Sequence, residues 1–115
     1  MTIAEDGCLL RIFIGESDRH GHQLLYEWIV RQARERGLAG ATVLRGIMGY
    51  GANSKVIHTF KIERLSEDLP VIIEIVDTRE KLESFLAEID AEIGAGLATL
   101  EKAEVRFYRS SNGGS

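Results

Sequence analysis

Four short runs of branched and aromatic residues along this chain alternate with two longer stretches in which apolar residues recur every three or four positions. The short runs have the length and composition of β-strands and span 8–14, 41–47, 69–76 and 97–108. The longer stretches, 22–36 and 79–93, carry their apolar side chains on one face of a helix. The pattern therefore predicts the order strand, helix, strand, strand, helix, strand.

That order predicts an α+β fold of the ferredoxin-like β-α-β-β-α-β class. In this class two helices cover one face of a four-stranded antiparallel sheet. The ends of the helices carry signals of their own. Gly37 follows the first helix, and Leu38 is placed to contact Ala33 in a Schellman ending. Asp77 or Thr78 is placed to cap the second helix.

The predicted sheet is apolar on both faces. The strands at 8–14 and 69–76 carry branched or aromatic residues at odd and even positions alike. Because both helices lie on one face, the other face needs a different cover. We therefore predict that another copy of the chain covers it in a homo-oligomer.

The predicted domain spans 8–109, between a flexible N-terminus at 1–7 and a disordered, Ser/Gly-rich tail at 110–115. Its longest connection, 48–68, has about 20 residues, whereas the other connections are short. Loops of this length are usually functional. The alternation of apolar and polar residues at 56–63 is also that of an extra strand or ribbon.

Composition argues against several classes of protein. The formal net charge is −4, so the chain lacks the basic surface that nucleic-acid binding requires. No apolar run approaches the roughly 18 residues of a membrane span, and the first residues lack the basic region of a secretory signal. We therefore expect a cytoplasmic protein with no nucleic-acid partner and no membrane insertion. The single Cys8 has no intramolecular partner and is expected to pack as a small hydrophobic residue.

Closely spaced glycines follow the second predicted strand, in the run Arg45-Gly46-Ile47-Met48-Gly49-Tyr50-Gly51. Successive backbone amides in such a run can converge on an anion, and Arg45 and Lys55 would add positive charge. The same glycines suit a bulge or a tight turn. No predicted helix follows the run, so neither a dinucleotide fingerprint nor a phosphate loop is present. Ligand contact and turn formation both stay open as interpretations.

Other side chains that can carry chemistry are weaker candidates. Asp18, His20 and His22 are ligand types that suit a divalent transition metal, but histidines in a polar loop are commonly solvated. His58 alternates with apolar neighbours and is either a packed histidine or a general base. The sequence contains no nucleophile motif, so we assign no catalytic residue, no metal and no cofactor.

Three segments of the chain form longer motifs. They are Leu10-Arg-Ile-Phe-Ile-Gly-Glu16, Gly40-Ala-Thr-Val-Leu-Arg-Gly-Ile-Met-Gly-Tyr-Gly51 and Asp68-Leu-Pro-Val-Ile-Ile-Glu-Ile-Val-Asp77. Together they resemble the family catalogued as domain of unknown function 190. The Arg-Gly-Ile-Met-Gly-Tyr-Gly and Asp-Leu-Pro blocks, in that order and at that distance, carry the resemblance, which extends from about Leu9 to Phe107.

The resemblance implies the fold of the PII signalling proteins, which are homotrimers that bind adenine nucleotides in clefts between subunits. It implies that 48–68 occupies the place of the PII regulatory loop, which contacts target proteins. The implied ligand-binding residues are Arg45, Gly46, Gly49, Tyr50, Gly51, Lys55, His58, Gly94, Gly96 and Arg106. One feature departs from PII proteins, because the turn at 94–99 lacks their phosphate-binding positive charge.

The function implied by the resemblance is that of a regulatory trimer sensing a small anionic ligand, such as an adenine nucleotide. Members of the family are associated with fluoride-exporting membrane proteins, which implies a transporter as a target protein. Two alternatives stay open. One is a small enzyme on the same fold that depends on His58 or Arg45. The other is a metal-responsive trimer that uses Asp18, His20 and His22.

Overall fold

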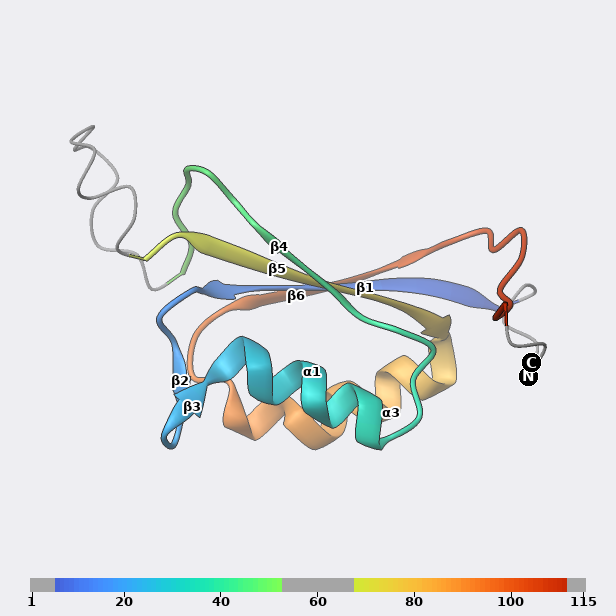
Figure 1. Ribbon diagram of the computed structural model, residues 1–115, viewed down its shortest axis with the longest axis horizontal. Helices are drawn as coiled ribbons and strands as arrows, with labels where there is room; N and C mark the ends of the chain where they lie inside the picture. The colour runs from blue at the N-terminus through green and yellow to red at the C-terminus, as the bar shows by residue number, and fades with distance from the viewer. Residues whose placement is uncertain (1–5, 53–67, 112–115) are drawn as a thin grey trace.

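Two helices lie under one face of a four-stranded antiparallel sheet (Figure 1). The computed structural model describes residues 6–52 and 68–111. The strands are β1 (Gly7–Gly15), β2 (Arg19–His20), β3 (Gln23–Leu24), β4 (Thr42–Arg45), β5 (Pro70–Thr78) and β6 (Leu97–Lys102). The helices are α1 (Leu25–Glu35), α3 (Arg79–Ile89) and the short 3₁₀ helix η1 (Asp90–Glu92).

Within the sheet the strands are ordered β4-β5-β1-β6, and every neighbouring pair is antiparallel. The central strand β1 pairs with β5 along its whole length, from Gly7 opposite Thr78 to Gly15 opposite Pro70. On its other side β1 pairs with β6. This order and connectivity are those of the ferredoxin-like fold, so the predicted fold class is confirmed.

The hydrophobic core lies between the sheet and the two helices. Along β1 and β5 every second side chain points towards the helices and is buried. The buried apolar residues are Cys8, Leu10, Ile12, Ile14, Leu25, Ile29, Ala33, Val71, Ile73, Ile75, Leu82, Phe85 and Ile89. Cys8 therefore packs as a small hydrophobic residue, as predicted. No helix in the described part of the chain is long and apolar enough to cross a lipid bilayer.

The two predicted helix ends are confirmed. Gly37 has a φ of 74°, and its amide donates to the Arg34 carbonyl (3.1 Å). The Leu38 amide donates to the Ala33 carbonyl (3.1 Å), which completes the Schellman motif. At the start of α3, the Thr78 hydroxyl accepts a hydrogen bond from the Lys81 amide (3.2 Å) and so caps the helix.

Asp77 has a different function from the cap considered for it. Its side chain is fully buried, with 0% of the residue exposed. The carboxylate accepts hydrogen bonds from the Ala39 amide (2.9 Å) and from the Thr78 amide (2.7 Å), and it lies 3.6 Å from Lys81 Nζ. Asp77 therefore ties the connection between α1 and β4 to the end of β5.

The first helix begins later than predicted. It starts at Leu25 rather than near His22, because Arg19–His20 and Gln23–Leu24 form the β2–β3 hairpin. Strands of two residues are too short to produce a visible alternation. The second predicted helix is close to the observed one, since η1 continues the helical path of α3 to Glu92.

The last strand is shorter than predicted. Strand β6 ends at Lys102, whereas the alternating pattern continues to Tyr108. Its partner β1 begins at Gly7, whose carbonyl accepts a hydrogen bond from the Ala103 amide (3.0 Å). Past that point β1 has no further residues to pair with. The Tyr108 hydroxyl instead donates to the Ala39 carbonyl (2.7 Å), at the connection between α1 and β4.

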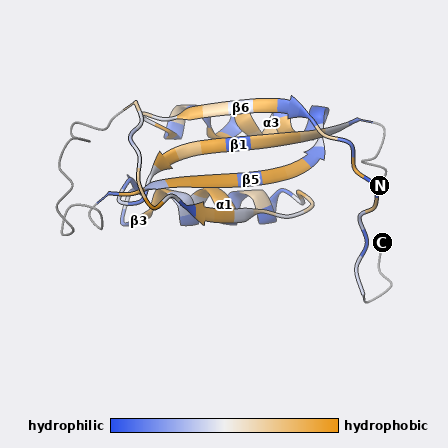
Figure 2. Cartoon of the chain, turned by 90° about the horizontal axis from the view of Figure 1, so that it is seen from above, coloured by the Kyte–Doolittle hydropathy of each residue, from blue (hydrophilic) through white to orange (hydrophobic). Residues whose placement is uncertain are grey.

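The outer face of the sheet is the face that the helices leave uncovered, and Figure 2 views the molecule from that side. Its apolar residues are Leu9, Phe13, Leu44, Ile72, Val76 and Leu97. Near its centre Arg11 forms ion pairs with Glu74 (2.9 Å) and Glu101 (2.8 Å). The hydrogen bond to Glu74 is the largest influence raising the pKa of Arg11 above its ordinary value. The prediction of a sheet that is apolar on both faces is confirmed.

Candidate ligand-binding cavity

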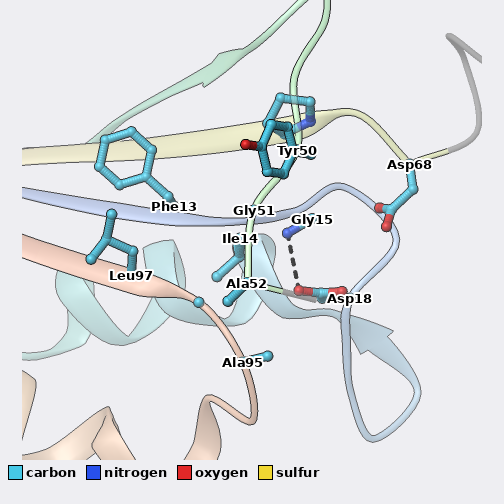
Figure 3. Close-up of a pocket in the computed structure, with 12 residues that line it drawn as sticks. Phe13, Ile14, Gly15, Asp18, Tyr50, Gly51, Ala52, Asp68, Ala95 and Leu97 are labelled. Carbon is cyan, nitrogen blue, oxygen red and sulfur yellow. Dashed lines mark hydrogen bonds between the residues drawn. The ribbon is translucent and has the colours of Figure 1, made fainter. Parts of the chain in front are cut away.

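A cavity of about 330 Å³ lies at the end of the sheet where β1 ends and β5 begins (Figure 3). Four parts of the chain surround it: the end of β1, the segment after β4, the start of β5 and the turn before β6. The lining residues are Phe13, Ile14, Gly15, Asp18, Tyr50, Gly51, Ala52, Asp68, Pro70, Ala95, Gly96 and Leu97. The volume is in the range of pockets that hold small ligands.

The segment after β4 reaches the cavity by folding over the start of β5. The Gly46 amide donates to the Pro70 carbonyl (2.7 Å). A Cβ atom on Gly46 would lie 2.8 Å from Pro70 Cγ, so this close approach requires glycine. The chain bends at Ile47 and Met48, which agrees with a turn as one of the two interpretations of the glycine run, and the chain after it brings Tyr50 and Gly51 to the cavity.

Two carboxylates converge on the end of β1. Asp18 accepts a hydrogen bond from the Gly15 amide (3.0 Å), and Asp68 accepts from the amide (3.0 Å) and the hydroxyl (2.9 Å) of Ser17. A Cβ atom on Gly15 would lie 2.7 Å from Asp68 Oδ1 and 3.1 Å from Asp18 Oδ1. Because the Asp18 carbonyl also accepts from the Leu25 amide (2.7 Å), the start of α1 fixes its backbone.

Arg45 lies at the edge of this region and does not line the cavity. It forms an ion pair with Glu16, and its side chain is 63% exposed. Its positive charge is therefore balanced at the surface. An ion pair as exposed as this one contributes little to stability, but it holds the Arg45 guanidinium beside Glu16.

The metal hypothesis requires Asp18, His20 and His22 to converge, and the structure separates them. His20 Nε2 lies 2.9 Å from a carboxylate oxygen of Glu92, while Asp18 faces the cavity and the Gly15 amide. Among the described residues, no group of three or more His, Cys, Asp or Glu side chains is arranged to hold a metal ion.

The implied ligand-binding residues fall into three groups. Tyr50, Gly51 and Gly96 line the cavity, and the Gly46 turn places the first two. Arg106 does not approach it within one chain, because Ala103 pairs with Gly7 and Tyr108 bonds to Ala39, both at the opposite end of the sheet. Gly94 is exposed and does not line the cavity, and Gly49 lies near Pro70. Lys55 and His58 lie outside the described residues. The ribbon or extra strand considered at 56–63 and most of 48–68 also lie outside them, as do 1–5 and 112–115.

Several lining residues were not identified from the sequence. Phe13 and Leu97 were assigned only to strands, and Asp68 was read as part of a loop. Asp18 was a candidate metal ligand and not a candidate cavity residue. The one available signal was that Gly15 and Asp68 both fall within the motifs that carry the family resemblance.

Comparison with known proteins agrees with this fold and these motifs. The family model for DUF190, described as "Uncharacterized ACR, COG1993", matches residues 7–105. The chain belongs to the DUF190 family. A UPF0166 protein of Aquifex aeolicus (strain VF5) is 45% identical to it over 99 residues, covering 86% of this chain and 92% of the relative. The family resemblance stated from the motifs is therefore confirmed.

Solved structures place this DUF190 member among the PII-like folds. Two structures of CPII, a nitrogen regulatory PII-like protein from Thiomonas intermedia K12, align with TM-scores of 0.61 and 0.59 at 15% identity. Both alignments cover 86% of this chain, and they cover 87% and 91% of CPII. One CPII structure is bound to ADP, AMP and acetate, and the other to ADP, AMP and bicarbonate. At this identity the likeness shows the fold alone.

Proposed function

We propose that this protein is a cytoplasmic PII-like regulator without catalytic activity. In this proposal it forms a homotrimer that senses a small anionic ligand, such as an adenine nucleotide, in clefts between subunits. The observation that carries the proposal is the cavity at the base of the segment 48–68, in a chain with a PII-like fold. The fold neighbour CPII binds ADP and AMP, which supports this class of ligand.

The outer face of the sheet supports assembly with other copies of the chain. It presents six apolar residues in one layer and is not covered by any described helix. An apolar sheet face of this kind is normally buried against another layer. At its centre Arg11 forms ion pairs with both Glu74 and Glu101, so each of these three side chains has a partner within the chain.

A trimer would also complete the ligand site. Within one chain Arg106 lies at the end of the sheet opposite the cavity. In the proposal it contributes to the cleft of another subunit, where its positive charge would meet an anionic group. Arg45, Gly46, Gly49, Gly94, Lys55 and His58 complete the proposed cleft around the residues that line the cavity.

The target protein is proposed to contact the segment 48–68, and a membrane transporter is the proposed class of target. The start of that segment is unusually apolar for an exposed turn. Ile47, the residue just before the segment, is 87% exposed, and Met48, its first residue, is 56% exposed. Exposed apolar side chains that lie together are typical of protein interaction sites.

The first test is the mass of the purified protein in solution, measured by light scattering, followed by calorimetric titration with AMP, ADP, ATP and cyclic AMP. A trimer that binds one of these ligands once per subunit would support the proposal. Tyr50→Ala should weaken binding at least tenfold, whereas Glu80→Gln, on the exposed surface of α3, serves as the control. A monomer, or a trimer that binds none of the four ligands, would contradict it, and turnover of a bound nucleotide would favour an enzyme instead.

A further inference from the structure

A row of polar side chains crosses the outer face of the sheet between apolar neighbours. Strand pairing places one residue of each strand side by side in this polar row: Thr42, Glu74, Arg11 and Thr99. The next row towards the end of β1 is apolar in every strand and consists of Leu44, Ile72, Phe13 and Leu97. On the other side of the polar row lie Val76, Leu9 and Glu101. The outer face is therefore striped, and its polar row spans the full width of the sheet.

The charges of the polar row have hydrogen-bonding capacity left over. Arg11 donates to Glu74 (2.9 Å) and to Glu101 (2.8 Å). The side chains of Arg11 and Glu74 are 36% and 31% exposed, and that of Glu101 is 56% exposed. An arginine has more N–H donors than these two contacts use, and each carboxylate has further acceptor sites. A second copy of this chain, which carries the same donors and acceptors, is therefore complementary in charge to this row.

The stripes make one alignment of two such faces more favourable than its neighbours. With the polar rows in line, apolar side chains meet apolar side chains, and the charges have partners of opposite sign within reach. A shift of two residues along a strand, roughly 7 Å, would instead place Arg11 and Glu74 against the apolar row of the other copy. A charge in that position loses its water and gains no partner, which is costly.

We propose that the ion pair of Arg11 and Glu74 determines the register in which copies of this chain pack against one another. The inference rests on the proposed homotrimer and adds the residues that select one arrangement of its subunits. The pair need not strengthen association, because replacing a buried ion pair by apolar residues is often neutral or stabilising. Its effect is on uniqueness, since a face that is apolar throughout permits several alignments, as in coiled coils that lack a polar core residue.

The test removes both charges together, so that neither is left without its partner. The variant is Arg11→Leu with Glu74→Leu. The matched control is Arg79→Leu with Glu83→Leu, which removes an ion pair of the same residue types (3.1 Å) from the exposed surface of α3.

Two measurements on the full-length protein report the packing of the subunits. Native mass spectrometry gives the number of subunits. A nitroxide label on Arg31→Cys, at an exposed position of α1, gives the distribution of distances between subunits by pulsed electron paramagnetic resonance. The native Cys8 is buried, with 2% of the residue exposed, and is protected from the label.

We expect the unaltered protein to give one subunit number and one narrow distance distribution. The leucine variant should assemble at similar concentrations, but its distance distribution should be at least about twofold wider or split into several peaks. The control should match the unaltered protein. Thermal melting shows whether each variant has folded. If the leucine variant has not, methionine at the same two positions replaces leucine, because its flexible side chain adapts to irregular space.

The outcomes separate this inference from the proposed trimer. An unchanged distribution in the variant, or the same broadening in the control, would show that the pair does not set the register, although assembly stands. A monomeric variant beside an assembled control would show that the pair drives association instead, which also overturns the inference. A monomeric unaltered protein would refute the trimer itself, and the inference would fail with it.

Discussion

The imidazole ring of His20 stacks on the indole ring of Trp28, with the ring centroids 4.0 Å apart and the planes inclined by 15°. His20 Nε2 also lies 2.9 Å from a carboxylate oxygen of Glu92. One side chain of the β2–β3 hairpin therefore contacts both α1 and η1. Trp28 is partly buried and packs against the hydrophobic core as well as against His20 of this hairpin.

Replacing His20 should loosen the hairpin that carries it. We expect His20→Ala to lower the free energy of unfolding by about 1 kcal/mol, the value typical of an aromatic stack of this kind. The ion pair with Glu92 adds little, because both side chains are substantially exposed. Chemical denaturation measures the change. His22→Ala, an exposed histidine on the same hairpin, should change stability by less than about 0.5 kcal/mol. Equal effects of the two substitutions would show that the stack contributes nothing.

Removing the buried carboxylate of Asp77 should be the more damaging change. Asp77→Ala leaves the partly buried amides of Ala39 and Thr78 without their acceptor, and we expect a loss of about 1 to 3 kcal/mol. Asp77→Asn retains one acceptor oxygen and should cost less. The exposed Asp90, replaced by alanine, is the control and should have a small effect. If Asp77→Ala unfolds in denaturant at the same midpoint as the unaltered protein, the connection between α1 and β4 does not depend on this carboxylate.

A charge on the outer face of the sheet should prevent assembly. Val76 lies opposite Leu9 on that face, and Val76→Glu would bury an unpaired carboxylate in the proposed interface between subunits. We expect a monomer by light scattering at concentrations where the unaltered protein forms the proposed trimer. Ser84→Glu adds the same side chain on the exposed surface of α3 and should leave the mass unchanged. Val76→Glu that remains trimeric would place the interface elsewhere.

Adding a methyl group at Gly46 should displace the turn that brings Tyr50 to the cavity. The new Cβ atom would lie 2.8 Å from Pro70 Cγ and 3.4 Å from the Pro70 carbonyl oxygen. We expect Gly46→Ala to cost about 1 to 3 kcal/mol, as overpacking typically does, and to weaken nucleotide binding. Gly40→Ala has open space around its Cβ and should be neutral or slightly stabilising. Denaturation and calorimetry on the same two variants test both effects. Unchanged binding by Gly46→Ala would separate the turn from the ligand site.

The elements of this protein follow from local sequence patterns. The helical period of α1 and α3 determines which of their side chains face the core. Along β1 and β5 the period of two separates the side chains into two faces, but both faces are apolar, so only the position of the helices decided which face became the core. The ending at Gly37 is equally local, since it needs one left-handed residue and one nearby contact. The motif blocks likewise sufficed to place the chain in its family.

The extent of β6 and the residues of the cavity depend on tertiary structure. The alternating pattern of β6 continues to Tyr108, but a strand lasts only as long as its partner, and β1 begins at Gly7. The cavity also depends on how the strands are arranged in the sheet. Because β1 lies between β5 and β6, its end meets the start of both strands, and Asp18, Asp68 and Leu97 converge although they are far apart in sequence. The spacing of residues in the sequence does not indicate which strand ends meet, so the residues of the cavity could be identified only from the order of the strands in the folded sheet.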